Sequence, residues 1–221
     1  MRTFIVRFLI ALPFTLGLIC AEPVVNFSGG GGGLIATTGQ IGGFITGSNI
    51  GIDQVTGLFT ASCTVCPSLR IMDGALNFQT GAITETSSLG MVFAPGGSIE
   101  ITGGIPDLGI PNGSVLLQGS FTAGSLSNYL FFTLFSSQGS DIENPVLAAN
   151  YGLGSAGYSF VGLGVSGGGL VYNSRTGLFE TNTIAATDYA NAYVPEPTVS
   201  ILLATALLLT GAALRRRLKA V

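Results

Sequence analysis

The sequence predicts an all-β protein, a Gly/Thr-rich β-sandwich of the jelly-roll kind. Three observations support this fold class: 47% of the 221 residues are hydrophobic, only 9% are charged, and glycine occurs 34 times. The chain is too apolar for a disordered protein, and its glycine content argues against long helices. Short apolar or alternating runs, separated by glycine-rich turns about every ten residues, are typical of packed sheets.

The clearest strand signals lie in the middle of the chain. Residues 98–102 alternate between apolar and polar side chains, and alternate residues from Val115 to Ala123 mark one face of a second strand. Asn112 and Gly113, just before it, predict a hairpin turn. The apolar run 129–135 predicts a strand that is buried on both faces. Further strands, enough for two packed sheets, are expected at 43–46, 49–55, 58–61, 75–78, 82–86, 91–94, 158–161, 170–172 and 178–183.

Residues 1–21 predict a secretory signal peptide. Arg2 and Arg7 precede an apolar stretch at 8–20, and Ala21 is the small residue expected at a cleavage site. We expect cleavage between Ala21 and Glu22, which leaves residues 22–193 as the exported domain. Two alternatives stay open, a lipid on Cys20 and an uncleaved anchor, although the apolar run is shorter than the roughly 20 residues of a spanning helix.

The C-terminal segment, residues 194–221, carries three signals in a fixed order. A Val-Pro-Glu-Pro motif is followed by residues 198–214 without a charge and by a basic tail at 215–221. A helix of that uncharged length spans roughly 26 Å, close to the hydrocarbon core of a bilayer at about 30 Å. Basic residues favour the cytoplasmic side, which leaves the preceding domain outside. The residues concerned are Val194, Pro195, Glu196 and Pro197 in the motif, and Arg215, Arg216, Arg217 and Lys219 in the tail.

This segment resembles the PEP-CTERM sorting signal, which joins a Pro-Glu-Pro motif, a short hydrophobic helix and a basic tail. The resemblance implies that exosortase, a membrane-embedded cysteine protease, cuts near the motif and passes the domain to the envelope surface or the extracellular matrix. It also implies passage through the general secretory machinery and the inner membrane. The alternative is an ordinary tail anchor. The tail is also grouped with the C-terminal region of certain ice-binding proteins, which implies nothing about the domain before it.

Composition excludes most catalytic and nucleic-acid functions. The chain contains no histidine, which removes Ser-His-Asp and Cys-His catalysis and most transition-metal sites. Between the terminal basic clusters stand two arginines and eleven acids, and this net charge of −9 opposes binding to nucleic acid. Glycine-rich patterns at 152–157, 162–167 and 164–168 are interpreted as turns. The sequence predicts no catalytic residue, no metal site and no cofactor.

Carboxylate chemistry survives this elimination, because glycoside hydrolysis needs only a pair of acids. Asp141 and Glu143 stand two residues apart, on one face of a strand or loop. The simpler interpretation is a solvated loop or a weak calcium site. The regular calcium-binding loop sequence is absent, so calcium is not assigned.

Cys63 and Cys66 form a Cys-x-x-Cys motif, which can be a local disulfide, a redox couple or half of a zinc site. Export favours the disulfide. Zinc would need a second cysteine pair or histidines, and a redox couple would need a helix after Cys63, which the following residues discourage. Closing so small a loop should stabilise the fold by about 2 kcal/mol at most.

Together these features predict a noncatalytic protein of the cell surface or of the exopolysaccharide matrix. The main alternative is a carbohydrate-binding adhesin module, in which exposed tyrosine and phenylalanine rings would stack on sugars. The absence of tryptophan removes the best aromatic platform. An ice-binding protein and a carboxylate-based glycosidase are weaker alternatives, because the threonine triplets at 84–86 and 181–183 do not recur at a repeat spacing and no pair of acids stands out.

Overall fold

The computed structural model describes residues 23–129, 132–154 and 157–193. The expected signal peptide with its Ala21–Glu22 cleavage site lies outside the described residues, and so does segment 194–221 with its motif, the expected hydrophobic helix and the basic tail. Within the described part of the chain, no helix is long and apolar enough to cross a membrane.

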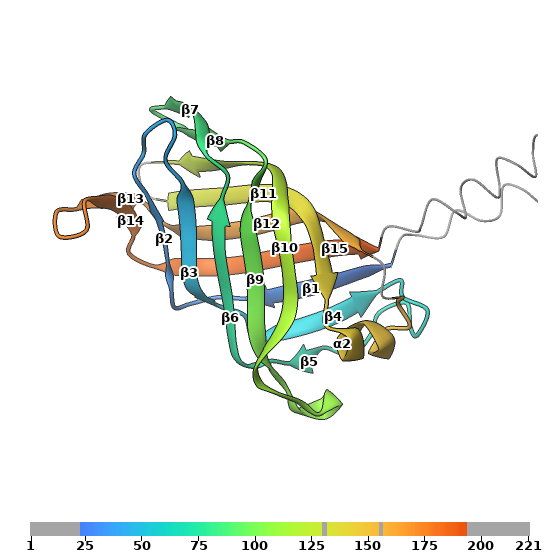
Figure 1. Ribbon diagram of the computed structural model, residues 1–221. Coiled ribbons are helices and arrows are strands. Elements are labelled where there is room, and N and C mark those ends of the chain that lie inside the picture. The colour runs from blue at the N-terminus through green and yellow to red at the C-terminus, as the bar shows by residue number, and fades with distance from the viewer. Residues whose placement is uncertain (1–22, 130–131, 155–156, 194–221) are drawn as a thin grey trace, which may run out of the picture.

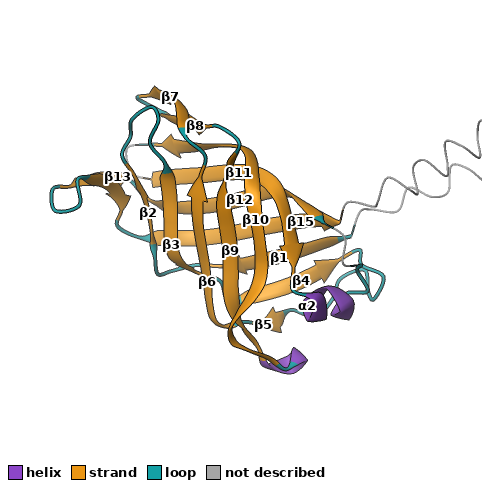
Figure 2. Ribbon diagram, in the orientation of Figure 1, coloured by secondary structure: helices purple, strands orange, loops and turns teal. Residues whose placement is uncertain are grey.

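Strands dominate the described residues, which confirms the all-β class, and the little helix that forms is purple in Figure 2. It comprises the 3₁₀ helix η1 (Pro106–Leu108) and the α-helix α2 (Pro145–Asn150). The strands, in chain order, are β1 (Val24–Gly29), β2 (Leu34–Thr37), β3 (Ile45–Gly51), β4 (Gln54–Leu58), β5 (Leu69–Arg70), β6 (Met72–Thr80), β7 (Ile83–Ser87), β8 (Gly90–Phe93), β9 (Gly96–Ile105), β10 (Ile110–Asn128), β11 (Phe132–Glu143), β12 (Tyr158–Gly168), β13 (Leu170–Asn173), β14 (Leu178–Thr181) and β15 (Ile184–Tyr193).

All fifteen of these strands belong to one hydrogen-bonded antiparallel sheet. Its order is β13-β14-β2-β3-β6-β9-β10-β11-β12-β15-β1-β4-β5, and the β7–β8 hairpin is attached to β10 through β8. In Figure 1, β3, β6, β9 and β10 stand in front, and β12, β15, β1 and β4 run across behind them. The sheet therefore bends back over its own inner face.

At one corner of the bent sheet, the chain passes twice between the front strands and the rear strands. β3 leads into β4 past Ile52, and β5 leads into β6 past Ile71. Backbone hydrogen bonds cross the corner, from Ile52 N–H to the Gly74 carbonyl (3.1 Å) and from Ile71 N–H to the Asp53 carbonyl (2.8 Å). A Cβ at position 74 would collide with the carbonyl oxygen of Ile52, so only glycine fits this corner.

The enclosed core is built around phenylalanine rings from four strands. Phe78 of β6 stacks on Phe135 of β11 at 4.5 Å between ring centroids, and Phe93 of β8 stacks on Phe135 at 5.7 Å. Phe121 of β10 meets the same three rings edge to face. All four side chains are buried. Offset and edge-to-face ring pairs of this kind add stability beyond their buried area.

The prediction that residues 129–135 form a strand buried on both faces is wrong. The strand β11 begins at Phe132 and alternates strictly, with Thr133 and Phe135 buried and Phe132 and Leu134 49% and 40% exposed. Only the inner face of the bent sheet is covered, so a long apolar run still exposes every second side chain.

Two local expectations also differ from the structure. The turn between β9 and β10 is formed by η1 and by Gly109, which has a φ of 67°, whereas Asn112 and Gly113 lie inside β10 at a break in register. No helix was expected, yet α2 forms, because Asn144 Oδ1 accepts a hydrogen bond from Val146 N–H (3.0 Å) and Pro145 occupies the first helical turn.

Candidate functional site

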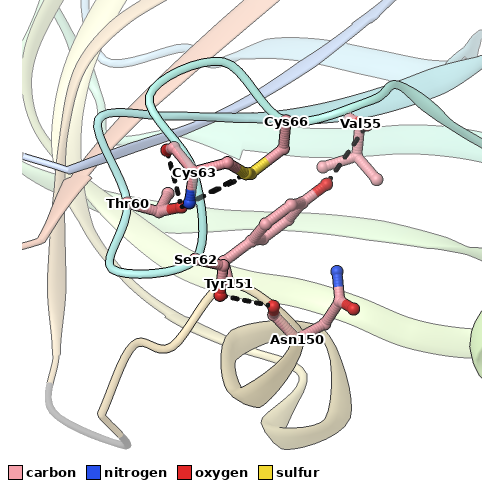
Figure 3. Close-up of a disulfide and its surroundings, with 7 residues drawn as sticks. All are labelled: Val55, Thr60, Ser62, Cys63, Cys66, Asn150 and Tyr151. Atoms are coloured by element: carbon pink, nitrogen blue, oxygen red, sulfur yellow. Dashed lines mark hydrogen bonds between the residues drawn. A yellow bond between two sulfur atoms is a disulfide. The ribbon is translucent and has the colours of Figure 1, made fainter.

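The predicted disulfide between Cys63 and Cys66 is present, with 5.3 Å between the Cα atoms. Figure 3 shows it in the loop after β4, where Thr60 Oγ1 accepts a hydrogen bond from Cys63 N–H (3.3 Å). Ser62 of the same loop donates to the Asn150 carbonyl at the end of α2 (3.0 Å). Beside it, the Tyr151 hydroxyl donates to the Val55 carbonyl (3.3 Å). The disulfide therefore closes the loop after β4, and the hydrogen bond from Ser62 attaches that loop to the end of α2.

A groove of about 870 Å³ crosses the outer face of the sheet, over the strands that stand in front in Figure 1. Its floor runs across β3, β6, β9, β10 and the end of β11. Side chains of these strands point alternately inward and outward, so the residues between the core positions face the groove. They are mostly polar: Thr46, Ser48, Asn77, Gln79, Ser98, Glu100, Gln118, Ser120, Ser140 and Ile142.

Strand register arranges these groove side chains in rows. Glu100 of β9 lies directly between Asn77 of β6 and Gln118 of β10. A second row joins Thr46, Gln79 and Ser98. Neighbours within a row lie about 4.8 Å apart, the spacing of paired strands. The rows therefore form a continuous polar surface.

The groove side chains with the longest reach have no partner within the described protein. Gln79, Glu100 and Gln118 are exposed, and their side chains make no hydrogen bond to another described residue. Asn77 is anchored, because its Oδ1 accepts a hydrogen bond from Asn49 N–H (2.9 Å). Its amide nitrogen therefore remains to donate into the groove. The surface offers donors and acceptors together on a rigid sheet.

Charge in the groove is sparse and negative. Among its lining residues only Glu100 and Asp141 are ionisable acids, no lysine or arginine is present, and the Asp141 side chain points into the core. The two arginines of the described chain, Arg70 and Arg175, are exposed and lie elsewhere. Glu100 is thus the exposed charge of the groove.

Asp141 and Glu143 are buried, so the expectation of a solvated loop is wrong. Both lie on the inner face of β11 and are 4% and 5% exposed. The Tyr189 hydroxyl donates a hydrogen bond to Asp141 Oδ2, and Asn191 Nδ2 donates to Glu143 Oε1 at 2.9 Å. We call these four residues the acid cluster. No group of three metal-binding side chains occurs among the described residues.

Burial raises the pKa values of both acids of the cluster, which have no cationic partner within the described part of the chain. It raises the pKa of Asp141 to about 6, although hydrogen bonds from Tyr189 and Asn191 act in the opposite direction. Burial raises the pKa of Glu143 to about 8. The hydrogen bond from Asn191 acts against this rise, and the charge of Asp141 adds to it. The pKa of Tyr189 is raised well above its ordinary value, so this hydroxyl remains a donor. Glu143 is therefore mainly neutral at pH 7.

Several oxygen atoms of the acid cluster have no hydrogen-bond partner among the described residues. They are Asp141 Oδ1, Glu143 Oε2 and Asn191 Oδ1, and all are inaccessible to solvent. All three atoms are hydrogen-bond acceptors when the carboxyl groups are ionised. A proton on one carboxyl oxygen supplies the missing donor. Because both acids are enclosed, this arrangement fits one neutral carboxyl group better than two ionised ones.

Exposed aromatic residues gather in pairs outside the groove. Tyr129 and Phe132 stack at 4.5 Å between centroids, and Tyr172 packs against Phe179 at 5.4 Å. All four are at least 39% exposed, and none lines the groove. If exposed rings stack on sugars, as the sequence suggested, they do so outside the polar groove.

The groove is the feature that the sequence did not reveal. Alternation around Ser98 and Glu100 predicts which side chains face outward from one strand, but the rows arise from the register of strands far apart in the chain. No protein family, curated protein or solved structure matches this chain. The groove and the terminal segments are therefore the features that bear on function.

Proposed function

We propose that this chain is a noncatalytic protein of the bacterial surface or exopolysaccharide matrix. It is exported by the general secretory route and sorted by exosortase through residues 194–221. The three-part order of motif, hydrophobic segment and basic tail supports this route. We also propose that the bent sheet is a sandwich of the jelly-roll kind, because its buried apolar side chains form one cluster between the front and rear strands.

Within this role, the β domain holds a polysaccharide in the groove. The observation that carries the proposal is a set of exposed amide, hydroxyl and carboxylate side chains in the two rows that make no side-chain hydrogen bond to another described residue. They are Gln79, Ser98, Glu100 and Gln118. Sugar hydroxyls both donate and accept hydrogen bonds, and amides match both roles. Five neighbouring strands, with four gaps of about 4.8 Å, give the groove a width of roughly 19 Å. That extent suits a chain of several sugars better than a single one.

Binding of polysaccharides to the full chain tests this proposal. A panel of neutral, basic and acidic polymers is presented to the wild type and to the double variant Gln79→Ala, Gln118→Ala. Two lost hydrogen bonds, each contributing about 0.5–1.5 kcal/mol, should weaken binding roughly tenfold. Gln40→Ala is the matched control, because Gln40 is equally exposed but lies in the loop between β2 and β3, outside the groove. If no polymer binds, or if the double variant binds as tightly as the wild type, the groove is not the site.

Mass spectrometry of the mature protein tests the sorting proposal separately. Exosortase processing predicts a new C-terminus near Pro195 to Pro197. An intact Val221 on the mature protein would instead favour a simple tail anchor. Because this measurement does not depend on binding, export and groove function can fail independently.

A carbohydrate-binding adhesin is the second candidate, and the two exposed aromatic pairs favour it. Rings that are about half exposed offer a face on which a sugar can stack. Under this alternative, Tyr129→Ala and Tyr172→Ala would weaken binding while the double glutamine variant would not. The same polysaccharide panel therefore separates the two candidates.

A further inference from the structure

We propose that the groove binds an amine-bearing polysaccharide, with the ammonium group of one amino sugar held at Glu100. This inference rests on the proposed function, because it assigns a chemical class to the ligand of the same groove. It goes further in naming the charge that the ligand carries and the residue that recognises it.

Glu100 occupies the centre of the polar surface. It lies on β9, with Asn77 on one neighbouring strand and Gln118 on the other. Its carboxylate is exposed and accepts no hydrogen bond from another described residue. A ligand group that approaches the middle of the groove therefore meets a negative acceptor whose hydrogen-bonding capacity is unused.

The two amides beside Glu100 complete a site for an ammonium group. An ammonium has three donors and no acceptor. The Glu100 carboxylate and the Gln118 amide oxygen can accept two of its hydrogens. Asn77 differs, because its oxygen is already occupied by Asn49 N–H, so its nitrogen donates to a hydroxyl or ring oxygen of the adjoining sugar. The row thus distinguishes the amine of a sugar from its oxygen atoms.

Charge around the groove discriminates between classes of polysaccharide. The described residues carry nine acids and two arginines, and neither arginine lines the groove. An acidic polymer is repelled by this field. A neutral polymer can donate a hydroxyl hydrogen to the Glu100 carboxylate, but it brings no opposite charge. A basic polymer brings an ammonium donor, so both partners of the hydrogen bond are charged and attract each other directly.

Calorimetry on the full chain, with three short oligosaccharides of equal length, tests the assignment. The probes are a glucosamine oligomer, its N-acetylated counterpart and a uronic acid oligomer. We expect the glucosamine oligomer to bind about tenfold more tightly than the acetylated one, and the uronate not to bind. Glu100→Gln should remove that preference, and it should lower the affinity for the acetylated oligomer far less than the affinity for the glucosamine oligomer.

Glu85→Gln is the matched control for general attraction between a basic oligomer and an acidic domain. Glu85 lies on β7, is exposed, and is not among the groove residues. If Glu85→Gln lowers the glucosamine affinity as much as Glu100→Gln does, the preference is nonspecific and the inference is overturned.

Failure of the inference can be separated from failure of the proposed function. Equal binding of the glucosamine and acetylated oligomers, weakened for both by Gln118→Ala, would retain the groove as a polysaccharide site and overturn the role of Glu100. Binding of another polymer from the broader panel, without binding of glucosamine, would likewise overturn the role of Glu100 and retain the groove. If nothing in either set binds, both proposals fail.

Discussion

Replacing Glu143 by glutamine should remove most of the pH dependence of this fold. The carboxyl has a pKa of about 8 in the folded protein and 4.5 as the reference value for the unfolded chain. A group with a raised folded pKa binds more protons when folded. Stability is therefore greatest below the unfolded pKa and is lost as the pH rises toward the folded one. For Glu143 this window runs from about pH 4.5 to about pH 8.

The magnitude follows from the difference in bound protons. Each unit of pKa difference corresponds to about 1.4 kcal/mol, so between pH 5 and pH 9 Glu143 should lower the free energy of unfolding by on the order of 4 kcal/mol. For a domain of this size that change lowers Tm by roughly 10 °C. Asp141, with a pKa raised to about 6, adds a smaller loss in the lower part of the same range.

Thermal unfolding of the full chain, followed by circular dichroism from pH 5 to pH 9, checks this prediction. The glutamine of Glu143→Gln resembles the protonated acid, so the variant should match the wild type at pH 5 and exceed its Tm at pH 9. The exposed Glu85→Gln should keep the wild-type slope. If Glu143→Gln does not fold, Asp141→Asn provides a second variant, because an asparagine oxygen can still accept the hydrogen bond from Tyr189.

A wild-type Tm that stays constant or rises between pH 5 and pH 8 would refute this prediction. A Glu143→Gln variant with the same slope as the wild type would refute it equally. Either result would mean that the two carboxyl groups are solvated or paired with a cation, in contradiction to their burial.

Two further predictions concern the core and the disulfide. Phe135→Ala removes the ring that stacks on both Phe78 and Phe93, and it should lower the free energy of unfolding by about 3–5 kcal/mol. The control is Leu134→Ala, because Leu134 is the exposed neighbour of Phe135 and its loss should lower the free energy of unfolding far less. Urea titration of both variants measures the difference. Replacing Cys63 and Cys66 together by alanine should cost about 2 kcal/mol at most, because the closed loop is short. Wild-type protein treated with a reductant should have the same Tm as the double variant. Complete unfolding of either protein would contradict a role limited to closing one loop.

The sequence predicts the fold class and the disulfide because both depend on local information. Glycine-rich punctuation and the alternation at 98–102 report a sheet without knowledge of which strands pair. Cys63 and Cys66 are three residues apart, so their bond needs no knowledge of the global fold. The turn expected at Asn112 and Gly113 fails because Pro106 and Gly109 form a tighter turn a few residues earlier, and β10 absorbs the Asn-Gly pair as an irregularity.

The strand β11 explains why the acid cluster and the groove escaped prediction together. Its outward residues include Phe132, Leu134 and Ile142, whereas its inward residues include Asp141 and Glu143, the reverse of the usual hydrophobic pattern. Hydrophobicity read along this strand therefore assigns the acids to solvent. The register of β11 with β10 and β12 places the acids on the inner face instead. That register cannot be read from a short window of sequence.

The same period of two links the interior of the sheet to its outer surface. Ser140 and Ile142 line the groove, while Asp141 and Glu143 between and beside them enter the core. A slip of one residue in β11 would turn both acids into the groove and bury Ile142 in their place. The groove would then carry three carboxylates instead of the single exposed charge of Glu100. The inward placement of the acid cluster therefore leaves Glu100 as the one exposed acid of the groove, the residue at which we propose that the ammonium group of one amino sugar is held.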